Sequence, residues 1–382
     1  MSIVVRTAES PADDPRLKEV WDWIWDGHAP DDEQLRAPAQ GEMRLLAEVD
    51  GKTAGACIAH DYLVARGSAD LKCGGVAAVG TLPAFRGQGV AHKMMVDLLY
   101  VMRDSGQQIA CLYAFRDKYY RKLGYEVCGW RWELEVPADR MPKFESDLPV
   151  KSVSPDELSQ LEKVYTSFIR GFSGSVLRRK DQWERRMGKK PPMVLAVGDP
   201  IEGYCWATVK EFWEDVKVGE IAWSTERGYE ALMGVLQGLA SNQKHVVWSE
   251  PPDSRFLALH MDQGVDAKMS RWTMFRVLDL PSALMALKPE HDGEFTIEVR
   301  DELLCENDGC WRVVFSSDGV EVTKADSADL HTDIGHFSQA LMGSPSISQL
   351  AEQGAVRVDS QQALDAAEAL LTPLPVCCME FF

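Results

Sequence analysis

The chain has 382 residues, 45% hydrophobic and 26% charged, a composition that excludes a disordered or collagen-like chain and suffices for two or three packed domains. Its 41 basic and 59 acidic residues give a formal net charge of −18 at pH 7, which disfavours nucleic acid and an anionic membrane as partners and favours a cationic one. Much of the acidity lies in residues 286–382, where 18 acids accompany 5 bases, so this last quarter is expected to differ in kind.

The nine cysteines are an odd number without any Cys-x-x-Cys pair, which indicates neither a disulfide framework nor a zinc site. The first seven residues lack a basic stretch followed by an apolar one, and no apolar run approaches the ~18 residues of a membrane-spanning helix. We therefore expect a reduced cytoplasmic protein with no metal and no membrane span.

Strand and helix patterns alternate through the first 130 residues. Asp-Gly at residues 50–51 supplies the positive backbone angles of a tight turn and predicts a hairpin around it. Apolar residues recur every four positions from 89 to 104, which predicts a helix with one buried stripe. The predicted elements are the strands 45–49, 54–60, 71–81 and 109–114, the helices 89–104 and 117–123, and a strand from Tyr125. This order is typical of an α/β or α+β domain of roughly 140 residues.

A connector rich in Pro and charge, residues 137–149, precedes a stretch that repeats the same order in outline. Its predicted helices are 155–169, 180–187 and 229–240, and its predicted strands are 194–197, 203–210 and 219–223. A third unit has the predicted strands 295–299, 310–315 and 320–323 and the helices 333–341, 346–351 and 360–371. The sequence thus predicts an α+β protein with domains 1–140, 141–288 and 289–382.

The most informative motif lies where the strand ending at Thr81 enters a turn and then a helix. Unpaired backbone N–H groups at a helix start bind anions, and glycines let a pyrophosphate approach the backbone. Arg86, Gly89 and Ala91 fill the pattern Arg-x-x-Gly-x-Ala, which resembles the coenzyme A loop of the GNAT N-acetyltransferases. The glycine spacing disfavours a Rossmann loop, and a Walker loop lacks its Gly-Lys-Ser/Thr. The bland alternative is an ordinary glycine-containing turn.

The GNAT resemblance implies acetyl-CoA as cosubstrate. It also implies that the strand before the loop splays from its neighbour, so that the backbone groups of Val79 and Thr81 pair with the pantetheine arm like an added strand. The residues that the resemblance places on the pyrophosphate are Arg86, Gly87, Gln88, Gly89, Val90 and Ala91.

A second GNAT signature stands at residues 119–125, Tyr-Tyr-Arg-Lys-Leu-Gly-Tyr. In that family the matching tyrosine, here Tyr120, lies beside the thioester sulfur and acts as the general acid. A phenol of pKa ~10 can protonate a thiolate of pKa ~8.5 once geometry and desolvation help. The alternatives are that Tyr120 only packs on the sheet, or that Tyr119 takes the role.

A base must deprotonate an ammonium substrate before it attacks the thioester. The strand 74–81 carries no acid, and His28, Asp26 and His60 are not distinguished by their spacing. The apolar tail 376–382 offers another source, because its burial would raise the pKa of the Phe382 α-carboxylate from ~3.5 towards that of a useful base. The alternative is that the tail merely fills a groove.

Taken whole, the chain resembles the enhanced intracellular survival (Eis) family of aminoglycoside N-acetyltransferases. That resemblance implies two GNAT domains, the second degenerate, followed by a sterol-carrier-protein-like domain, with Tyr120 and the Phe382 carboxylate as the catalytic pair. It also implies homo-oligomers, trimers or hexamers. Glu380 is expected to contact substrate, although it stands one position earlier than the family's acid. The second unit lacks the Arg-x-x-Gly-x-Ala motif at residues 224–230, which predicts one coenzyme site per chain.

The region 21–26 flanks the acceptor pocket in GNAT domains. Trp21, Trp25 and Asp26 are expected to bind a cationic acceptor through ring faces and charge, with at least one of the tryptophans belonging to the core instead. The predicted function is transfer of acetyl from acetyl-CoA to a small-molecule or peptide amine, aminoglycoside-like or lysine-like. The alternatives are a long-chain acyl-CoA N-acyltransferase and a non-catalytic protein that binds a hydrophobic ligand.

Overall fold

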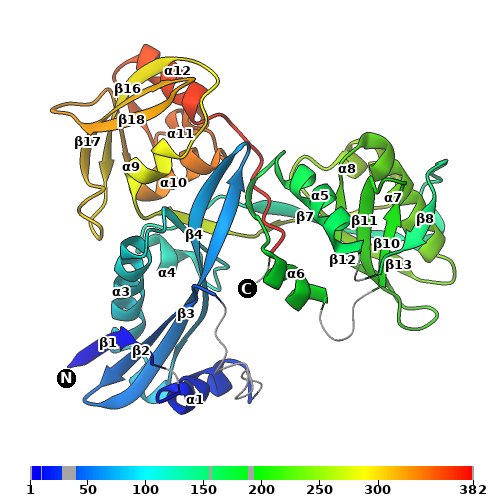
Figure 1. The fold of residues 1–382 in the computed structure, drawn as a ribbon, viewed down its shortest axis with the longest axis horizontal. Helices are drawn as coiled ribbons and strands as arrows, with labels where there is room; N and C mark the ends of the chain where they lie inside the picture. The colour runs from blue at the N-terminus through cyan, green and yellow to red at the C-terminus, as the bar shows by residue number, and fades with distance from the viewer. Residues whose placement is uncertain (1, 10, 28–39, 155–156, 188–192, 381–382) are drawn as a thin grey trace.

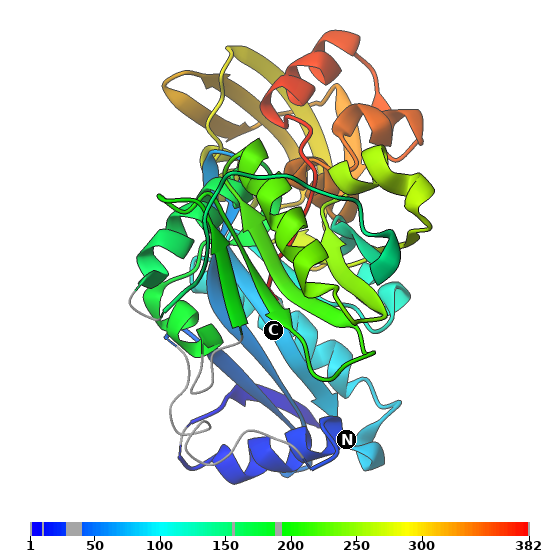
Figure 2. The same cartoon turned by 90° about the vertical axis from the view of Figure 1, so that its right-hand side faces the viewer.

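The computed structural model describes residues 2–9, 11–27, 40–154, 157–187 and 193–380. Three β-sheets, each covered by helices, occur along the chain, and the predicted α+β class is confirmed (Figure 1). Turned by 90°, the third unit lies above the other two (Figure 2). The predicted helix 155–169 begins on residues outside the described ones, and its described part is α5 (Leu158–Ile169).

The first sheet has the order β1-β2-β3-β4-β5-β15-β6, with β9 pairing on β3. The hairpin expected around Asp50-Gly51 forms, but its second strand runs on for 15 residues, and the far end of the β3–β4 hairpin reaches the third unit (Figure 1). The strands are β1 (Ile3–Thr7), β2 (Met43–Val49), β3 (Lys52–Arg66), β4 (Ala69–Thr81), β5 (Ile109–Leu112), β6 (Glu126–Val127), β9 (Ser173–Val176) and β15 (Met274–Val277); the helices are α1 (Asp14–Ile24), α3 (Val90–Asp104) and α4 (Asp117–Arg121).

The second sheet has the order β14-β7-β13-β12-β11-β10-β8. Its strands are β7 (Trp130–Pro137), β8 (Val150–Ser152), β10 (Met193–Val197), β11 (Gly203–Thr208), β12 (Val216–Trp223), β13 (His245–Glu250) and β14 (Asp266–Arg271). Its helices are α5, α6 (Lys180–Met187), α7 (Glu226–Leu239) and α8 (Arg255–His260).

The two sheets exchange strands. β7 follows the strands of the first sheet in sequence, yet it pairs antiparallel with β13 and β14 of the second. In return β15 follows the second sheet's strands and lies between β5 and β6 of the first. Each sheet therefore depends on a strand from the other unit.

The third sheet has the order β18-β17-β16-β19-β20 and its core is continuous with the far end of the β3–β4 hairpin. Arg66 at that end donates to the carbonyl oxygens of Leu341 (2.7 Å) and Thr372 (2.7 Å). The elements are β16 (Gly293–Arg300), β17 (Gly309–Ser316), β18 (Gly319–Lys324), β19 (Leu330–Asp333), β20 (Arg357–Val358), α9 (Leu280–Met285), α10 (Ile334–Met342), α11 (Ile347–Glu352) and α12 (Gln361–Leu370). After α12 the chain descends between the other two units (Figure 1).

Candidate active site

β4 and β5 run parallel and pair only from Cys73–Ile109 to Val76–Leu112. Beyond Val76, β4 continues to Thr81 without β5, so the two strands diverge and leave the stretch that contains Val79 and Thr81 unpaired on this side. A bulge accompanies the divergence, because Ala56 pairs with Gly80 while Ile58 pairs with Ala77. This splayed edge can accept an added strand.

The bulge holds Ala78 at φ +50°, a left-handed conformation that costs free energy for a residue with a Cβ atom. The Trp21 indole N–H donates to the Ala78 carbonyl oxygen at 3.2 Å and is itself fully buried. Trp21 therefore belongs to the core that supports the bulge, which corrects the expectation that it lines the acceptor pocket. It also meets the expectation that at least one tryptophan of this region is core.

The predicted loop leads from Thr81 through a 3₁₀ turn at Pro83–Phe85 into α3. Gly87 (φ +75°) and Gly89 (φ +84°) adopt left-handed conformations that favour glycine, and a Cβ atom at either would point into open space. Gly89 is the N-cap of α3, and no side chain caps that helix. The first N–H groups of a 15-residue helix are therefore not taken by a cap and can bind an anion. Arg86 lies beside them, with its Nε donating to the Thr81 carbonyl oxygen at 3.1 Å.

Tyr120 lies on α4 with 3% of its surface exposed, and the rings of Phe115, Tyr119 and Tyr125 surround it at centroid distances of 5.5, 5.0 and 6.2 Å. Burial raises its pKa, with smaller contributions from Tyr119 and Cys57. Burial likewise raises the pKa of Tyr119 to about 12, and the Tyr119 hydroxyl is buried without a hydrogen-bond partner among the described residues. Both phenols are thus kept protonated, as a general acid requires.

A buried ion pair holds the segment after Tyr120. Arg276 on the exchanged strand β15 donates to the Leu123 carbonyl oxygen (2.7 Å) and pairs with Asp301 of the third unit (2.8 Å). Gly124 (φ +79°) gives this arginine room, because a Cβ atom there would lie 2.9 Å from Arg276 Nε. Contacts from both later units therefore fix the end of α4.

The C-terminal tail, residues 375–380, contacts β9 and the residue that follows β5. Ser173 N donates to the Pro375 carbonyl oxygen (3.0 Å) and Cys377 N to the Ser173 carbonyl oxygen (2.8 Å). The Trp272 indole N–H donates to the Cys378 carbonyl oxygen at 3.0 Å, and the Tyr113 hydroxyl donates to that of Glu380. Tyr113 directly follows β5, so the tail reaches the diverging end of the first sheet. Phe382 lies outside the described residues.

The Glu380 carboxylate lies between two arginine side chains. Arg178 Nε donates to one carboxylate oxygen, and Arg186 Nη1 to the other at 3.2 Å. Guanidinium groups of the chain thus engage both carboxylate oxygens, and the expected contact of Glu380 with substrate stays a prediction.

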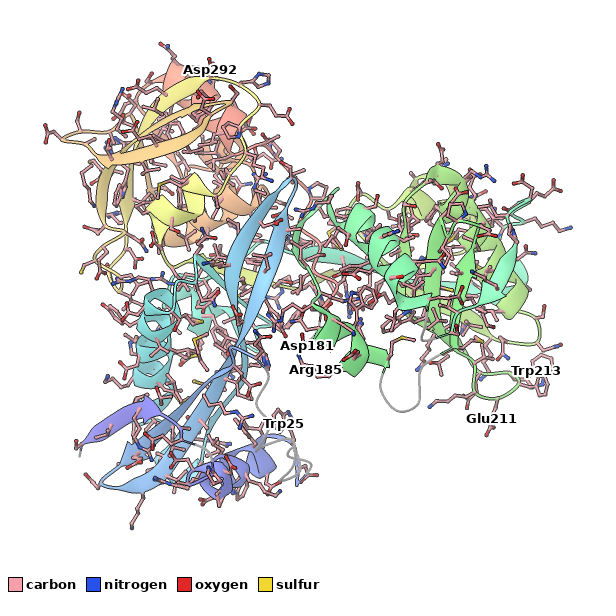
Figure 3. All side chains as sticks on the ribbon, viewed as in Figure 1. Trp25, Asp181, Arg185, Glu211, Trp213 and Asp292 are labelled. Atoms are coloured by element: carbon pink, nitrogen blue, oxygen red, sulfur yellow. The ribbon has the colours of Figure 1, made fainter. Side chains whose placement is uncertain are left out.

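Two of the other predicted residues are placed near the end of α1. Trp25 is 38% exposed with its ring 6.1 Å from that of Trp21, and Asp26 is exposed at φ +49° (Figure 3 labels Trp25). The base candidate His60 pairs with Glu42 at 3.4 Å, and His28 lies outside the described residues. Tyr113, Trp272 and Arg178 were not predicted as parts of the site, because their contacts with the tail join residues more than 100 positions apart in the sequence.

The second unit has a diverging pair of parallel strands like that of the first, but the helix that follows begins differently. β12 and β13 pair in parallel only at Val216–Val246 and Lys217–Val247 before they diverge. α7 begins there, but the Thr225 hydroxyl caps it by accepting from Gly228 N at 3.0 Å, and Glu226 stands in its first turn. This capped, acidic helix start suits an anion less well than the start of α3, and a single coenzyme site per chain stays a prediction.

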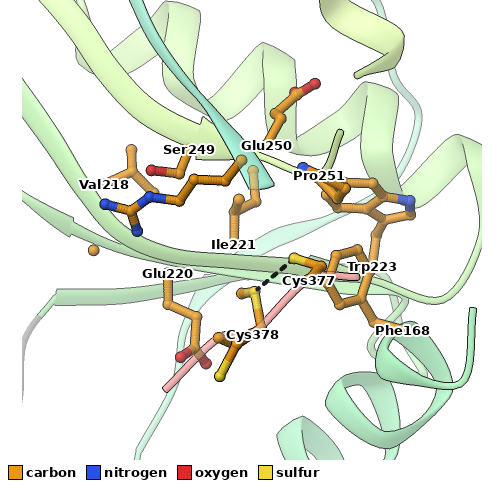
Figure 4. Close-up of a pocket in the computed structure, with 13 residues that line it drawn as sticks. Phe168, Val218, Glu220, Ile221, Trp223, Ser249, Glu250, Pro251, Cys377 and Cys378 are labelled. Atoms are coloured by element: carbon orange, nitrogen blue, oxygen red, sulfur yellow. Dashed lines mark hydrogen bonds between the residues drawn. The ribbon is translucent and has the colours of Figure 1, made fainter. Parts of the chain in front are cut away.

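The tail also closes a small cavity of about 50 Å³ beside β12. Figure 4 shows Cys377 next to the rings of Phe168 and Trp223, and Cys378 and Glu220 also line the cavity. Cys377 and Cys378 are only 5% and 4% exposed. Cys377 packs in a core cluster with second-unit residues, whereas the Cys378 sulfur lies 3.3 Å from the Tyr113 hydroxyl of the first unit.

Three family models match the chain. Two are described as acetyltransferase (GNAT) domains and match residues 10–128 and 174–277, and one is described as a sterol carrier protein domain and matches residues 280–379. N-acetyltransferase Eis of Mycobacterium tuberculosis is 26% identical over 343 residues, covering 82% of each chain. An uncharacterized N-acetyltransferase of Streptomyces coelicolor is 25% identical over 315 residues, covering 76% of each. The chain is thus an N-acetyltransferase with two GNAT domains and a sterol carrier protein domain, and it is similar to the Eis enzymes over most of its length.

Solved structures share the Eis-type fold over the whole chain. Eis1 from Mycobacterium abscessus has a TM-score of 0.80 at 22% identity, and a probable N-acyltransferase from Enterococcus faecalis has a TM-score of 0.91 at 18% identity, each covering 100% of both chains. The tandem GNAT architecture with a third sterol-carrier-protein domain is thereby confirmed.

GNAT acetyltransferases use acetyl-CoA. Among the described residues, no group of three or more His, Cys, Asp and Glu side chains could hold a metal ion. Within the described part of the chain, no helix is both long and apolar enough to cross a membrane.

Proposed function

We propose that this enzyme transfers the acetyl group of acetyl-CoA to an amino group of a cationic acceptor, with Tyr120 as general acid and the Phe382 α-carboxylate as general base. Within the proposal, residues 1–140 carry the reaction, 141–288 form the degenerate unit, and 289–382 deliver the chain end. The observation that carries the proposal is the convergence of the splayed β4, the uncapped start of α3 and the tail at the open end of the first sheet.

In the proposed binding mode, the backbone of Val79 and Thr81 pairs with the pantetheine arm, and the loop holds the pyrophosphate. Arg86 adds the positive charge, and the N–H groups of the uncapped helix start add directed donors. The full set of proposed contacts is Val79, Thr81, Arg86, Gly87, Gln88, Gly89, Val90 and Ala91.

Proton transfer follows from the neighbours of each group. Burial keeps the Tyr120 phenol protonated, so it can donate to the departing thiolate. β4 from Gly74 to Thr81 has no acid, so the base must come from elsewhere. A main-chain carboxylate can take this role when partial burial raises its pKa. The side chains of Val376, Cys377 and Cys378, shortly before the chain end, are buried, which supports partial burial of the proposed base.

The acceptor is proposed to be an aminoglycoside-like or lysine-like amine. The net charge of −18 and the exposed Trp25 and Asp26 support a cationic ligand. A homo-oligomer, trimer or hexamer, and a cytoplasmic location remain part of the proposal. The alternative hypothesis is that a long-chain acyl-CoA, and not acetyl-CoA, is the acyl donor. Competition assays with longer acyl-CoAs would distinguish the two.

The decisive experiment alters only the chain end. A variant with two glycines appended after Phe382 is expected to lose at least ~10²-fold in kcat, the scale of a lost general base, while its affinity for acetyl-CoA stays unchanged. Two glycines appended at the N-terminus are the matched control. Full activity of the C-terminally extended enzyme would refute the terminal carboxylate as base and leave the acetyltransferase assignment intact.

A further inference from the structure

Arg178 is a buried arginine that joins the tail to the second sheet. Its side chain is 1% exposed, and its two terminal nitrogens donate to the two carboxylate oxygens of Glu220 at 2.9 and 2.6 Å. Its Nε donates to Glu380, two residues from the chain end. The rings of Tyr165 and Trp183 lie 4.0 and 4.6 Å from the guanidinium carbon and restrict its orientation.

A second arginine completes the cluster from α6. Arg186 donates to Glu220 at 2.6 Å and to Glu380 at 3.2 Å, and its guanidinium carbon lies 4.9 Å from the centre of the Trp206 ring. The cluster therefore holds two positive and two negative charges in mutual contact. A balanced buried cluster of this kind is a poor site for a further cation, whereas it restricts the position of each member.

Arg178 and Glu220 hold each other in the charged form. Burial alone would raise the pKa of Glu220, but Arg178 and Arg186, together with the hydrogen bond from Tyr204 (2.6 Å), outweigh it and lower that pKa to about 2. Burial would lower the pKa of Arg178, and the Glu220 and Glu380 charges raise it instead. Glu380 thus meets two permanent cations.

The tail has backbone ties up to Glu380, and the Glu380 carboxylate adds a side-chain tie to the second unit. Two residues span at most ~7 Å, so the position of Glu380 limits where the terminal carboxylate can be. Misplacement of a catalytic group by about 1 Å can cost ~10²-fold in rate.

We propose that Arg178 and Arg186 are positioning residues that act through Glu380 to set the terminal carboxylate, with Glu220 of the degenerate unit as their anchor. This inference rests on the proposed role of the Phe382 carboxylate. It gives the second unit a purpose in the reaction although it lacks a coenzyme loop: its strand β12 supplies the fixed charge from which the base is placed.

The test uses Glu380→Gln and Arg186→Gln in the full chain, because the deeply buried Arg178 is a less safe target for replacement. Arg185→Gln is the matched control: Arg185 stands next in sequence on α6 and pairs outward with Asp181 at 3.0 Å (Figure 3). Both test variants are expected to lose about tenfold or more in kcat with an unchanged KM for acetyl-CoA. Glu380→Asp keeps the charge one methylene shorter and should retain more activity than Glu380→Gln.

A second readout follows the tail itself. Carboxypeptidase should release Phe382 from native Glu380→Gln several times faster than from wild type or Arg185→Gln, since a tie near the chain end is lost. If release and kcat are both unchanged, the positioning role is refuted. If release accelerates while kcat is unchanged, the tie is real but the terminal carboxylate is not the base, and the proposed function fails at that point instead. A fall in kcat accompanied by an equal rise in KM for acetyl-CoA would also overturn the inference.

Discussion

Both GNAT-type sheets contain a pair of diverging parallel strands followed by a helix, but the chemistry at the two helix starts differs. In the first, β4 and β5 diverge over a helix start that no side chain caps. In the second, β12 and β13 diverge over a helix start capped by Thr225 and followed by Glu226. Residues 74–81 of β4, just before the first loop, include no acid, whereas β12 carries the buried Glu220.

A diverging strand pair is therefore only a structural framework. Whether it can bind a ligand depends on which hydrogen-bonding groups at its end have no partner within the protein. Free N–H groups and a nearby Arg86 suit a pyrophosphate, while a capped helix and a buried carboxylate suit a structural contact with arginines. Four predictions sharpen the comparison.

Tyr120→Phe tests the chemistry of the first unit. We expect kcat to fall about 10³-fold, because the general acid is lost, while the dissociation constant of acetyl-CoA stays unchanged. Burial raises the Tyr120 pKa, so the alkaline limb of wild-type kcat should lie above pH 10 and vanish in the variant. Tyr119→Phe is the control. A larger loss in Tyr119→Phe would transfer the role to that residue.

Glu220 tests the structural role of the second unit through acid stability. Its folded pKa of about 2 lies below its ordinary value of 4.5, so its stabilisation is fully present above pH 4.5 and is lost as pH falls towards 2. The difference corresponds to ~3 kcal/mol. Glu220→Gln should flatten this part of the stability curve, measured by urea unfolding between pH 2.5 and 6, and should lower stability at pH 7. Glu226→Gln, an exposed neighbour, should leave the curve unchanged.

A pair of arginine variants compares the two loops directly. Arg86→Gln should raise the KM for acetyl-CoA about tenfold, the effect of one lost charge-assisted hydrogen bond. Arg227→Gln, in the first turn of α7 in the second unit, should leave this KM unchanged, because that helix start is already capped. Equal effects of the two variants would contradict the single coenzyme site.

The smallest expected effect is that of removing the Thr225 N-cap of α7. Thr225→Ala should lower the free energy of unfolding by about 1 kcal/mol without changing coenzyme affinity, since it removes the acceptor for Gly228 N. Chemical denaturation and isothermal titration with coenzyme A measure the two quantities. Acquisition of a second coenzyme site by this variant would show that the cap alone blocks binding.

The third unit bears on the non-catalytic alternative. The side chains of Phe295, Phe315 and Phe337 are at most 2% exposed and fill the space between the sheet and its helices. This unit also supplies Asp301 to the contact behind α4 and leads into the tail. These contacts favour a part in the architecture of the active site over the carriage of a hydrophobic ligand.

Local chemistry in the sequence determined the loop and its helix. Gly87 and Gly89 adopt the left-handed conformations that a strand-to-helix turn needs, and α3 begins one residue after the predicted start and ends at Asp104 as predicted. The short helix α4, which carries Tyr120, was likewise predicted from local sequence, where Gly124 at φ +79° follows the end of the helix. Strand β13 was missed, although Val246 and Trp248 alternate with more exposed residues as in a half-buried strand.

Tertiary structure alone decided the exchange of β7 and β15, the bulge at Ala78, the burial of Trp21 and the pairing of Glu380 with Arg178 and Arg186. Turn and helix signals act over a few residues and can be read along the chain. The pairing of Glu380 with an arginine about 200 positions earlier depends on which surfaces come together on burial, and the sequence around either residue carries no trace of it.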